Sequence, residues 1–138
     1  MPEKKTVNRA RKAAREGKAP TTQAGEFVRE EMEHIREGKH GARNTKQAIA
    51  IGLSKARRAG VKLKPPKKGK ASEGTRKKAE QDYQRGQSAD KPKPSAKRSQ
   101  ATRRALKREG SKAASRTALS KQAKQASRAR KTRGKVSR

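Results

Sequence analysis

Residues 22–37 read TQAGEFVREEMEHIRE, and residues 46–59 read KQAIAIGLSKARRA. The apolar side chains of the first segment recur mostly three or four positions apart, at Ala24, Phe27, Val28, Met32 and Ile35. This spacing predicts an amphipathic helix over 22–37. Thr21 or Thr22 offers a hydroxyl that can cap the start of this helix, and Gly38 stands where a left-handed residue ends one.

The second segment predicts a helix over 46–59, which Thr45 caps and Gly60 ends. Its broad apolar arc consists of Ala48, Ile49, Ile51, Gly52, Leu53, Ala56 and Ala59. A glycine inside a helix costs about 1 kcal/mol relative to alanine. We therefore expect the first helix to approach closely at Gly52, where Phe27 needs room.

Together the two helices predict an αα-hairpin over 21–60. Its expected core consists of Phe27, Val28, Met32, Ile35, Ile49, Ile51 and Leu53, covered by Val61 and Leu63. A core of this size is marginal for independent stability. We therefore expect a homodimer through the hairpin, or bound DNA, to complete it.

The charge of the chain is large and unevenly distributed. Its 138 residues include 42 Lys and Arg but only 12 Asp and Glu, which gives a net charge of +30. The net charge is +5 over 1–19, +3 over 20–60 and +22 over 61–138, and no acidic residue follows Ser111. The nearly neutral middle is therefore where folding is expected, and the C-terminal part is expected to act as an electrostatic tail.

Large apolar residues are scarce, since Leu, Ile, Val and Phe together number 12. This composition with a high net charge is typical of disorder, and alanine, the main apolar residue, buries little surface. We therefore predict an all-α protein, with a small helical hairpin flanked by basic, largely disordered or conditionally helical segments. These are a basic arm over 1–20 with a frayed helix that Gly17 and Pro20 stop, a Pro/Lys linker over 61–72, a short polar helix over 73–86, and an Ala/Lys/Arg-rich tail over 87–138 with weak helices over about 96–109 and 112–131.

Several classes of protein and site find no support in the sequence. The chain has no cysteine, which excludes disulfides and cysteine-ligated metals. It has no apolar run of membrane-spanning length, no secretory signal pattern and no phosphate-binding glycine loop, so we expect a cytoplasmic protein, located on the nucleoid. No catalytic grouping, cofactor, metal site or small-molecule substrate is predicted, and we expect no enzyme.

The positive charge predicts binding to nucleic acid, with duplex DNA as the expected partner. Lys and Arg neutralise phosphates and release counterions, which produces affinity without reading of bases. The residues expected to make these contacts are Lys46, Arg57, Arg58, Lys67, Lys68, Lys70, Lys97, Arg98, Arg103, Arg104, Lys107, Arg108, Lys112, Arg116, Lys121, Lys124, Arg128, Arg130, Lys131, Arg133 and Lys135. The expected function is non-enzymatic, largely sequence-independent compaction of DNA.

The segment from Lys46 to Gly60, KQAIAIGLSKARRAG, is the most distinctive word in the chain. With the residues before it, over about 20–65, it resembles a family of small, uncharacterised, basic bacterial proteins. Some members are labelled as DNA-binding or plasmid-stabilisation proteins, and the resemblance implies no established activity. The tail over 91–138 is similar in composition alone to the tails of linker-histone-like proteins.

Other functions remain open at the level of sequence. An RNA- or ribosome-associated basic protein has the same composition, and an adaptor that binds a partner protein through the 21–60 hairpin is a further alternative. A helix-turn-helix would direct Lys46, Gln47, Ser54, Arg57 and Arg58 towards a groove, but that motif needs a third helix in its core. We therefore favour a packing or dimerisation unit over specific reading of bases.

The two histidines, His34 and His40, stand six residues apart at the end of the first predicted helix. No cysteine and no clear carboxylate group accompanies them, so exposed polar side chains are expected rather than a zinc site. His40 follows Lys39, and contact with phosphate is the more plausible role for it.

Overall fold

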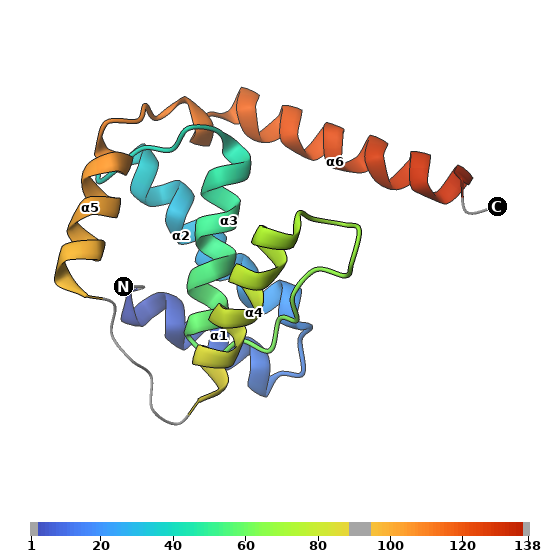
Figure 1. Cartoon of the computed structure of the whole chain (residues 1–138), viewed down its shortest axis with the longest axis horizontal. Helices are drawn as coiled ribbons and strands as arrows, with labels where there is room; N and C mark the ends of the chain where they lie inside the picture. Colours follow the sequence, from blue (N-terminus) through green and yellow to red (C-terminus); the bar gives the residue numbers. More distant parts are fainter. Residues whose placement is uncertain (1–2, 89–94, 137–138) are drawn as a thin grey trace.

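The computed structural model describes residues 3–88 and 95–136, with side chains described as far as Arg130. Within these ranges the chain is helical and contains no strand, which confirms the all-α prediction (Figure 1). No helix in the described part of the chain combines the length and the apolar character that crossing a membrane requires. The elements are α1 (Lys4–Arg15), α2 (Pro20–Arg36), α3 (Thr45–Arg58), α4 (Glu73–Gln87), α5 (Ala96–Lys107), the 3-10 helix η1 (Lys112–Ala114) and α6 (Arg116–Val136).

The helices α2 and α3 form the expected hairpin, but α2 begins earlier than its predicted cap. Pro20 occupies the first turn of α2 and Ala19 precedes it, with no side chain capping the helix. Proline suits this position because its missing N–H would have no partner there. The expectation that Thr21 or Thr22 caps this helix is therefore wrong, whereas α1 ends at Arg15, before Gly17 and Pro20.

The start of α3 also differs from the sequence prediction. Asn44, not Thr45, is the cap, and its side-chain oxygen accepts a hydrogen bond of 2.8 Å from the Gln47 N–H. Thr45 is the first helical residue and is buried, and its hydroxyl donates to the carbonyl oxygen of Ala113 at 2.6 Å. The residue predicted as a cap thus joins α3 to the C-terminal part of the chain.

Alanine makes up most of the interior. Of the 13 apolar residues that are buried in the described part of the chain, nine are alanines, and the other four are Phe27, Met32, Ile35 and Val61. The remaining residues of the predicted core, Val28, Ile49, Ile51, Leu53 and Leu63, are only half-buried. Small side chains let helices approach closely, so contact between backbones replaces much of the large-residue packing that the sequence lacks.

The interior divides into two clusters at opposite ends of the α2–α3 hairpin. One is formed around Phe27 by α1, α2 and α3, and it includes Ala10, Ala24, Ala56 and Val61. The other is formed around Ile35 and Met32, and it includes Ala113 and Ala114 of η1. Elements of the same chain therefore cover the hairpin, where a second copy or DNA was expected to do so.

The helices α1 and α4 pack against different helices of the hairpin, α1 against α2 and α4 against α3. Ala10 and Ala13 of α1 are buried against α2, and Ala79, Asp82 and Gly86 of α4 are buried against α3. A side chain at Gly86 would collide with the carbonyl oxygen of Arg57, so glycine is required for this approach. The regions predicted as a basic arm and a separate polar helix are thus packed into the folded unit.

The C-terminal part packs against the same unit at η1 and then extends away from it. Ala113 and Ala114 of η1 are buried in the Ile35 cluster, and Leu119, which is partly buried, packs against that cluster. Beyond this point α6 extends away from the other helices (Figure 1). The predicted single helix over 112–131 is therefore interrupted after Ala114, where the Ser115 hydroxyl accepts from the Ala118 N–H at 3.1 Å and starts α6.

Gly52 lies where α2 and α3 cross. A Cβ atom at this position would lie 2.7 Å from the Cα atom of Val28. The close approach expected at Gly52 is thus present, but the neighbour is the backbone of Val28 rather than the side chain of Phe27.

We expect the substitution Gly52→Ala to destabilise the fold by about 1–3 kcal/mol, because the added methyl group forces α2 and α3 apart. Urea unfolding followed by circular dichroism measures this change. Gly25→Ala is the matched control, since Gly25 is also within a helix and has nothing within 4 Å of an added Cβ. The control should be neutral or more stable by up to about 1 kcal/mol. Equal midpoints for the two variants would contradict the close crossing.

Candidate nucleic-acid interface

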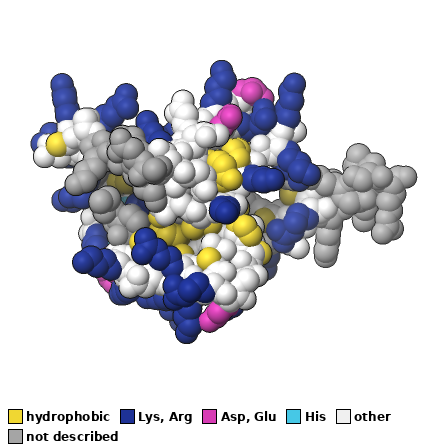
Figure 2. Space-filling view, turned by 90° about the horizontal axis from the view of Figure 1, so that it is seen from below, with side chains coloured by type: hydrophobic (Ala, Val, Ile, Leu, Met, Phe, Trp, Pro, Cys, Tyr) yellow, Lys and Arg dark blue, Asp and Glu magenta, His cyan; other side chains and the backbone are white. Residues whose placement is uncertain are grey.

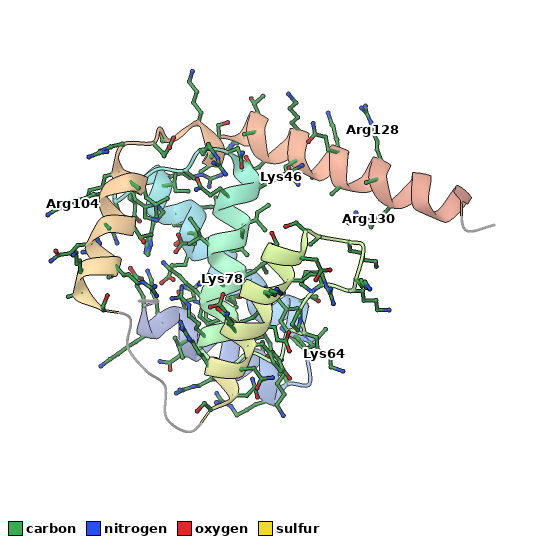
Figure 3. All side chains as sticks on the ribbon, viewed as in Figure 1. Lys46, Lys64, Lys78, Arg104, Arg128 and Arg130 are labelled. Carbon is green, nitrogen blue, oxygen red and sulfur yellow. The ribbon has the colours of Figure 1, made fainter. Side chains whose placement is uncertain are left out.

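Most of the residues predicted to contact phosphate are exposed. Lys46 on α3 and Lys67, Lys68 and Lys70 in the loop before α4 are exposed, as are the predicted residues from Lys97 to Arg130. Figure 3 shows Arg104 pointing outward from α5, and Arg128 and Arg130 on different sides of α6. The exposed members of the predicted set are Lys46, Lys67, Lys68, Lys70, Lys97, Arg98, Arg103, Arg104, Lys107, Arg108, Lys112, Arg116, Lys121, Lys124, Arg128 and Arg130. Lys131, Arg133 and Lys135 lie outside the described side chains.

Arg57 does not belong with these residues. It is only 8% exposed, and its guanidinium donates to the carbonyl oxygens of Leu63 at 3.0 Å and Lys64 at 3.2 Å. Burial lowers the pKa of the Arg57 guanidinium, and the charge of Asp82 acts in the opposite direction. Arg57 therefore holds the chain that leaves α3 and is not available to phosphate in this fold.

The polar face of α3 is covered by α4. The Ser54 hydroxyl donates to Asp82 Oδ2 at 2.6 Å, and Arg58 Nε lies 3.9 Å from Asp82 Oδ1. Gln47 is engaged locally, since its side-chain oxygen accepts from the Arg43 N–H at 2.6 Å. Of the side chains considered as readers of bases, Lys46 alone projects freely, so α3 is not arranged as a recognition helix.

Much of the exposed basic surface belongs to α5 and α6, two helices that contain no acidic residue. Neither α5 nor α6 includes Asp or Glu, and none of the residues of α5 is buried. On α6, Lys121, Lys124 and Arg128 lie along one shallow face together with Arg116. No carboxylate within these two helices reduces their positive charge.

Backbone contacts attach this basic surface to the folded unit. The Gly41 N–H donates to the Leu106 carbonyl oxygen at 2.8 Å, and the Ala42 N–H donates to Gly110 at 3.1 Å. Arg36 Nε donates to the Ala114 carbonyl oxygen at 3.0 Å. A side chain at Gly41 would collide with the carbonyl oxygen of Glu109, which shows how closely the two segments pass.

The acidic residues are distributed in the opposite way. Three of them, Glu30, Glu31 and Asp82, are buried, whereas Arg57 is the one buried cation among the described side chains. Folding therefore removes negative charge from the surface and leaves the cations there. Figure 2 shows many Lys and Arg side chains projecting from one face of the molecule, with acidic side chains in few places.

The structure overturns the expectation for the two histidines. The side chains of His34 and His40 are each 12% exposed, and both face the fully buried carboxylate of Glu31. His34 Nδ1 lies 3.9 Å from Glu31 Oε1, and His40 Nε2 lies 3.1 Å from Glu31 Oε2. His40 is thus directed inward rather than towards a phosphate.

Sequence reasoning missed this cluster although one signal was present. Glu31 and His34 are three residues apart, which places them on the same side of a helix. His40 joins them because the chain turns back at Gly38, which has a left-handed φ of 78°. The direction of that turn depends on tertiary packing, and the periodicity of the sequence does not specify it.

Glu3 extends the cluster to the N-terminal segment. Its carboxylate lies 3.4 Å from His34 Nε2 and 3.4 Å from Lys39 Nζ, and its backbone N–H donates to buried Glu30 at 2.6 Å. The contact with His34, followed by the hydrogen bonds from Lys39 and Lys5, lowers the pKa of the Glu3 carboxyl below its usual value. The contacts with Glu3 and Glu37 raise the pKa of Lys39.

Comparison with known proteins identifies similarity in the hairpin region. Residues 17–69, which include α2 and α3, match a family described as a family of unknown function (DUF6496). The match covers less than half of the chain and agrees with the resemblance to an uncharacterised family. It brings no activity, ligand or partner. No curated protein and no solved structure matches the chain significantly.

We expect Arg57→Gln to destabilise the protein by about 2–3 kcal/mol, because two carbonyl oxygens lose a charged donor. Lys46→Gln, which removes an exposed charge from the same helix, should change stability by no more than about 0.5 kcal/mol. Urea unfolding of both variants makes the comparison. If the two substitutions cost the same, Arg57 is not the structural contact described above.

The lowered pKa of Glu3 predicts a dependence of stability on pH. A carboxyl group whose pKa is lower in the folded state stabilises above its unfolded pKa, near 4.5, and the stabilisation is lost as the pH falls through the folded value. Glu3→Gln should therefore reduce stability at neutral pH, and its difference from the parent should shrink below about pH 4. Thermal unfolding across this pH range measures it. A difference that does not change with pH would exclude the ionised Glu3 contacts.

Proposed function

We propose that this protein binds duplex DNA through phosphate contacts, largely independently of sequence, and thereby compacts or coats it on the nucleoid. The observation that carries this proposal is the pair of acid-free helices, α5 and α6, which form a C-terminal arm (residues 95–136) attached to the folded unit. The basic side chains described on this arm, as far as Arg130, are exposed. Such a surface matches the regular negative charge of a duplex backbone.

The arrangement of α3 supports binding without reading of bases. Reading of bases in the major groove normally requires an exposed helix whose polar side chains reach base edges. Here α4 covers that face, with Ser54 and Arg58 turned towards Asp82. The cations that remain exposed are distributed over several elements, which favours contact with phosphates rather than with a single groove.

The same observation bears on the adaptor alternative. A protein-binding hairpin would need an unoccupied apolar face, but α1, α4 and η1 pack against α2 and α3. The largest residues that would form such a face, Phe27 and Ile35, are buried within the chain. The hairpin therefore supports the arm and is a less suitable docking surface than a hairpin on its own.

RNA carries the same phosphate charge, so competition decides between the two nucleic acids. A labelled duplex DNA bound to the protein is challenged with unlabelled duplex DNA or structured RNA at equal phosphate concentration. Preferential displacement by the DNA supports the proposal. Preferential displacement by the RNA would replace it with an RNA-associated role.

The affinity for a short mixed-sequence duplex should fall steeply with salt. With roughly eight phosphates neutralised, log K against log salt should have a slope of about −7. Replacing Arg116, Lys121 and Lys124 together by glutamine should reduce the magnitude of this slope by about 2.7, since each phosphate contact contributes about 0.9. Fluorescence anisotropy between about 50 and 200 mM salt measures the slopes.

A charge-matched control separates local contacts from net charge. Lys5, Lys18 and Arg29 each lie 3.3–3.4 Å from a glutamate, so replacing all three by glutamine removes cations that already have partners. This control should change the slope by less than about 1. Equal effects of the two triple variants would show that net charge, not the α6 surface, determines binding. Absence of binding by the parent at near-physiological salt would overturn the proposed function.

A further inference from the structure

The two histidines and Glu31 form a compact cluster of side chains of the types that bind metal ions. Glu31 and His34 come from the last two turns of α2, and His40 comes from the loop that follows. One potential ligand atom from each of the three lies within 4.8 Å of the other two. The ligand types are two imidazoles and one carboxylate, which is a common donor set for zinc.

Each histidine is oriented by an acceptor on its outer nitrogen. His34 presents Nδ1 to Glu31, while its Nε2 lies 3.4 Å from Glu3 Oε1. His40 presents Nε2 to Glu31, while its Nδ1 lies 2.9 Å from the carbonyl oxygen of Gly41. Metal-binding histidines are typically held in this way, with the outer N–H donated to a carboxylate or a backbone carbonyl.

The carboxylate of Glu31 has one oxygen still open. Its side chain is fully buried, and Lys55 Nζ donates to Oε1. Oε2 lies near His40 but has no hydrogen bond among the described residues. If both outer nitrogens carry the hydrogen, neutral rings direct lone pairs at this carboxylate, and a cation between them would remove the repulsion.

We propose that Glu31, His34 and His40 bind one Zn²⁺ ion, with Glu31 Oε2, His34 Nδ1 and His40 Nε2 as ligand atoms. Ligands at about 2.0–2.1 Å from a tetrahedral zinc lie about 3.3–3.5 Å apart. His40 Nε2 lies 3.1 Å from Glu31 Oε2, which is close to that spacing. His34 Nδ1 lies 3.9 Å from the other carboxylate oxygen, Oε1, so side-chain rotation is needed to bring all three ligand atoms onto one ion. Water would supply the fourth ligand, and the partly exposed rings leave a path of entry.

The site lies next to the residues that attach α5 to the folded unit. His40 immediately precedes Gly41 and Ala42, whose N–H groups hold the end of α5 and the residues after it. A zinc ion bound to His40 would fix this loop to the end of α2. It would thereby also stabilise the attachment of α5 and η1. The inference concerns binding of metal and stability, and it does not depend on the proposed binding of DNA.

The test uses the full chain without a histidine tag, freed of nucleic acid and treated with a chelator. Isothermal titration with Zn²⁺ should give one ion per chain, and thermal unfolding should shift upward in zinc but not in Mg²⁺, which prefers all-oxygen sites. Zinc affinity should fall as the pH is lowered, since ligating imidazoles must lose their protons.

Variants identify the ligands. His34→Gln and His40→Gln should each weaken zinc binding at least about 100-fold, and Glu3→Gln about 10-fold through its effect on His34. Glu33→Gln is the control, because Glu33 is on the same helix but pairs with Arg29 at 3.3 Å. It should bind zinc like the parent.

Circular dichroism of each metal-free histidine variant, compared with that of the metal-free parent, shows whether the variant is still folded. A folded variant that has lost zinc binding supports the site. Absence of stoichiometric zinc binding by the parent overturns it, as does unchanged affinity in both histidine variants.

Discussion

Three buried carboxylates join the helices of a chain whose net charge is +30. Glu30 of α2 accepts from the Glu3 N–H and the Thr6 hydroxyl at the start of α1, and Glu31 of α2 accepts from Lys55 of α3. Asp82 of α4 accepts from Ser54 of α3. Each carboxylate therefore connects a different pair of segments. Breaking a buried, charged contact by removing one partner costs about 3–5 kcal/mol, which is large beside the stability of a small domain.

These contacts matter because the apolar interior is built mainly of alanine. An alanine buries little surface, so each contributes little hydrophobic free energy. Glycines, which have no side chain, permit the close crossing of α2 and α3 at Gly52 and of α3 and α4 at Gly86. At such short distances a buried carboxylate reaches donors on the neighbouring helix. Close backbones and buried anions thus support each other, and the surface is left with the cations.

The helical hairpin could be predicted because its apolar residues recur with the period of a helix. The helix ends could be predicted because glycine readily adopts the positive φ that ends a helix, and Gly17, Gly38 and Gly60 do adopt it. The starts were less predictable. A cap depends on which hydroxyl or amide faces the first free N–H groups, and neighbouring residues compete for that position. Asn44 rather than Thr45 caps α3, and the Thr45 hydroxyl instead donates to the carbonyl oxygen of Ala113, which is far away in sequence. The cluster of Glu31, His34 and His40 escaped prediction for the same reason, since a loop brings its third member into place.

The sequence by itself determined the helical class and the excess of positive charge, because periodicity and composition are properties of the chain in any conformation. The tertiary structure alone decided which charges are accessible. Arg57 is buried and donates to carbonyl oxygens, and Glu31 is buried, whereas the cations described on α5 and α6, as far as Arg130, are exposed. The physical reason is that burial depends on contacts between residues distant in sequence, such as η1 against α2, and no local pattern records those contacts.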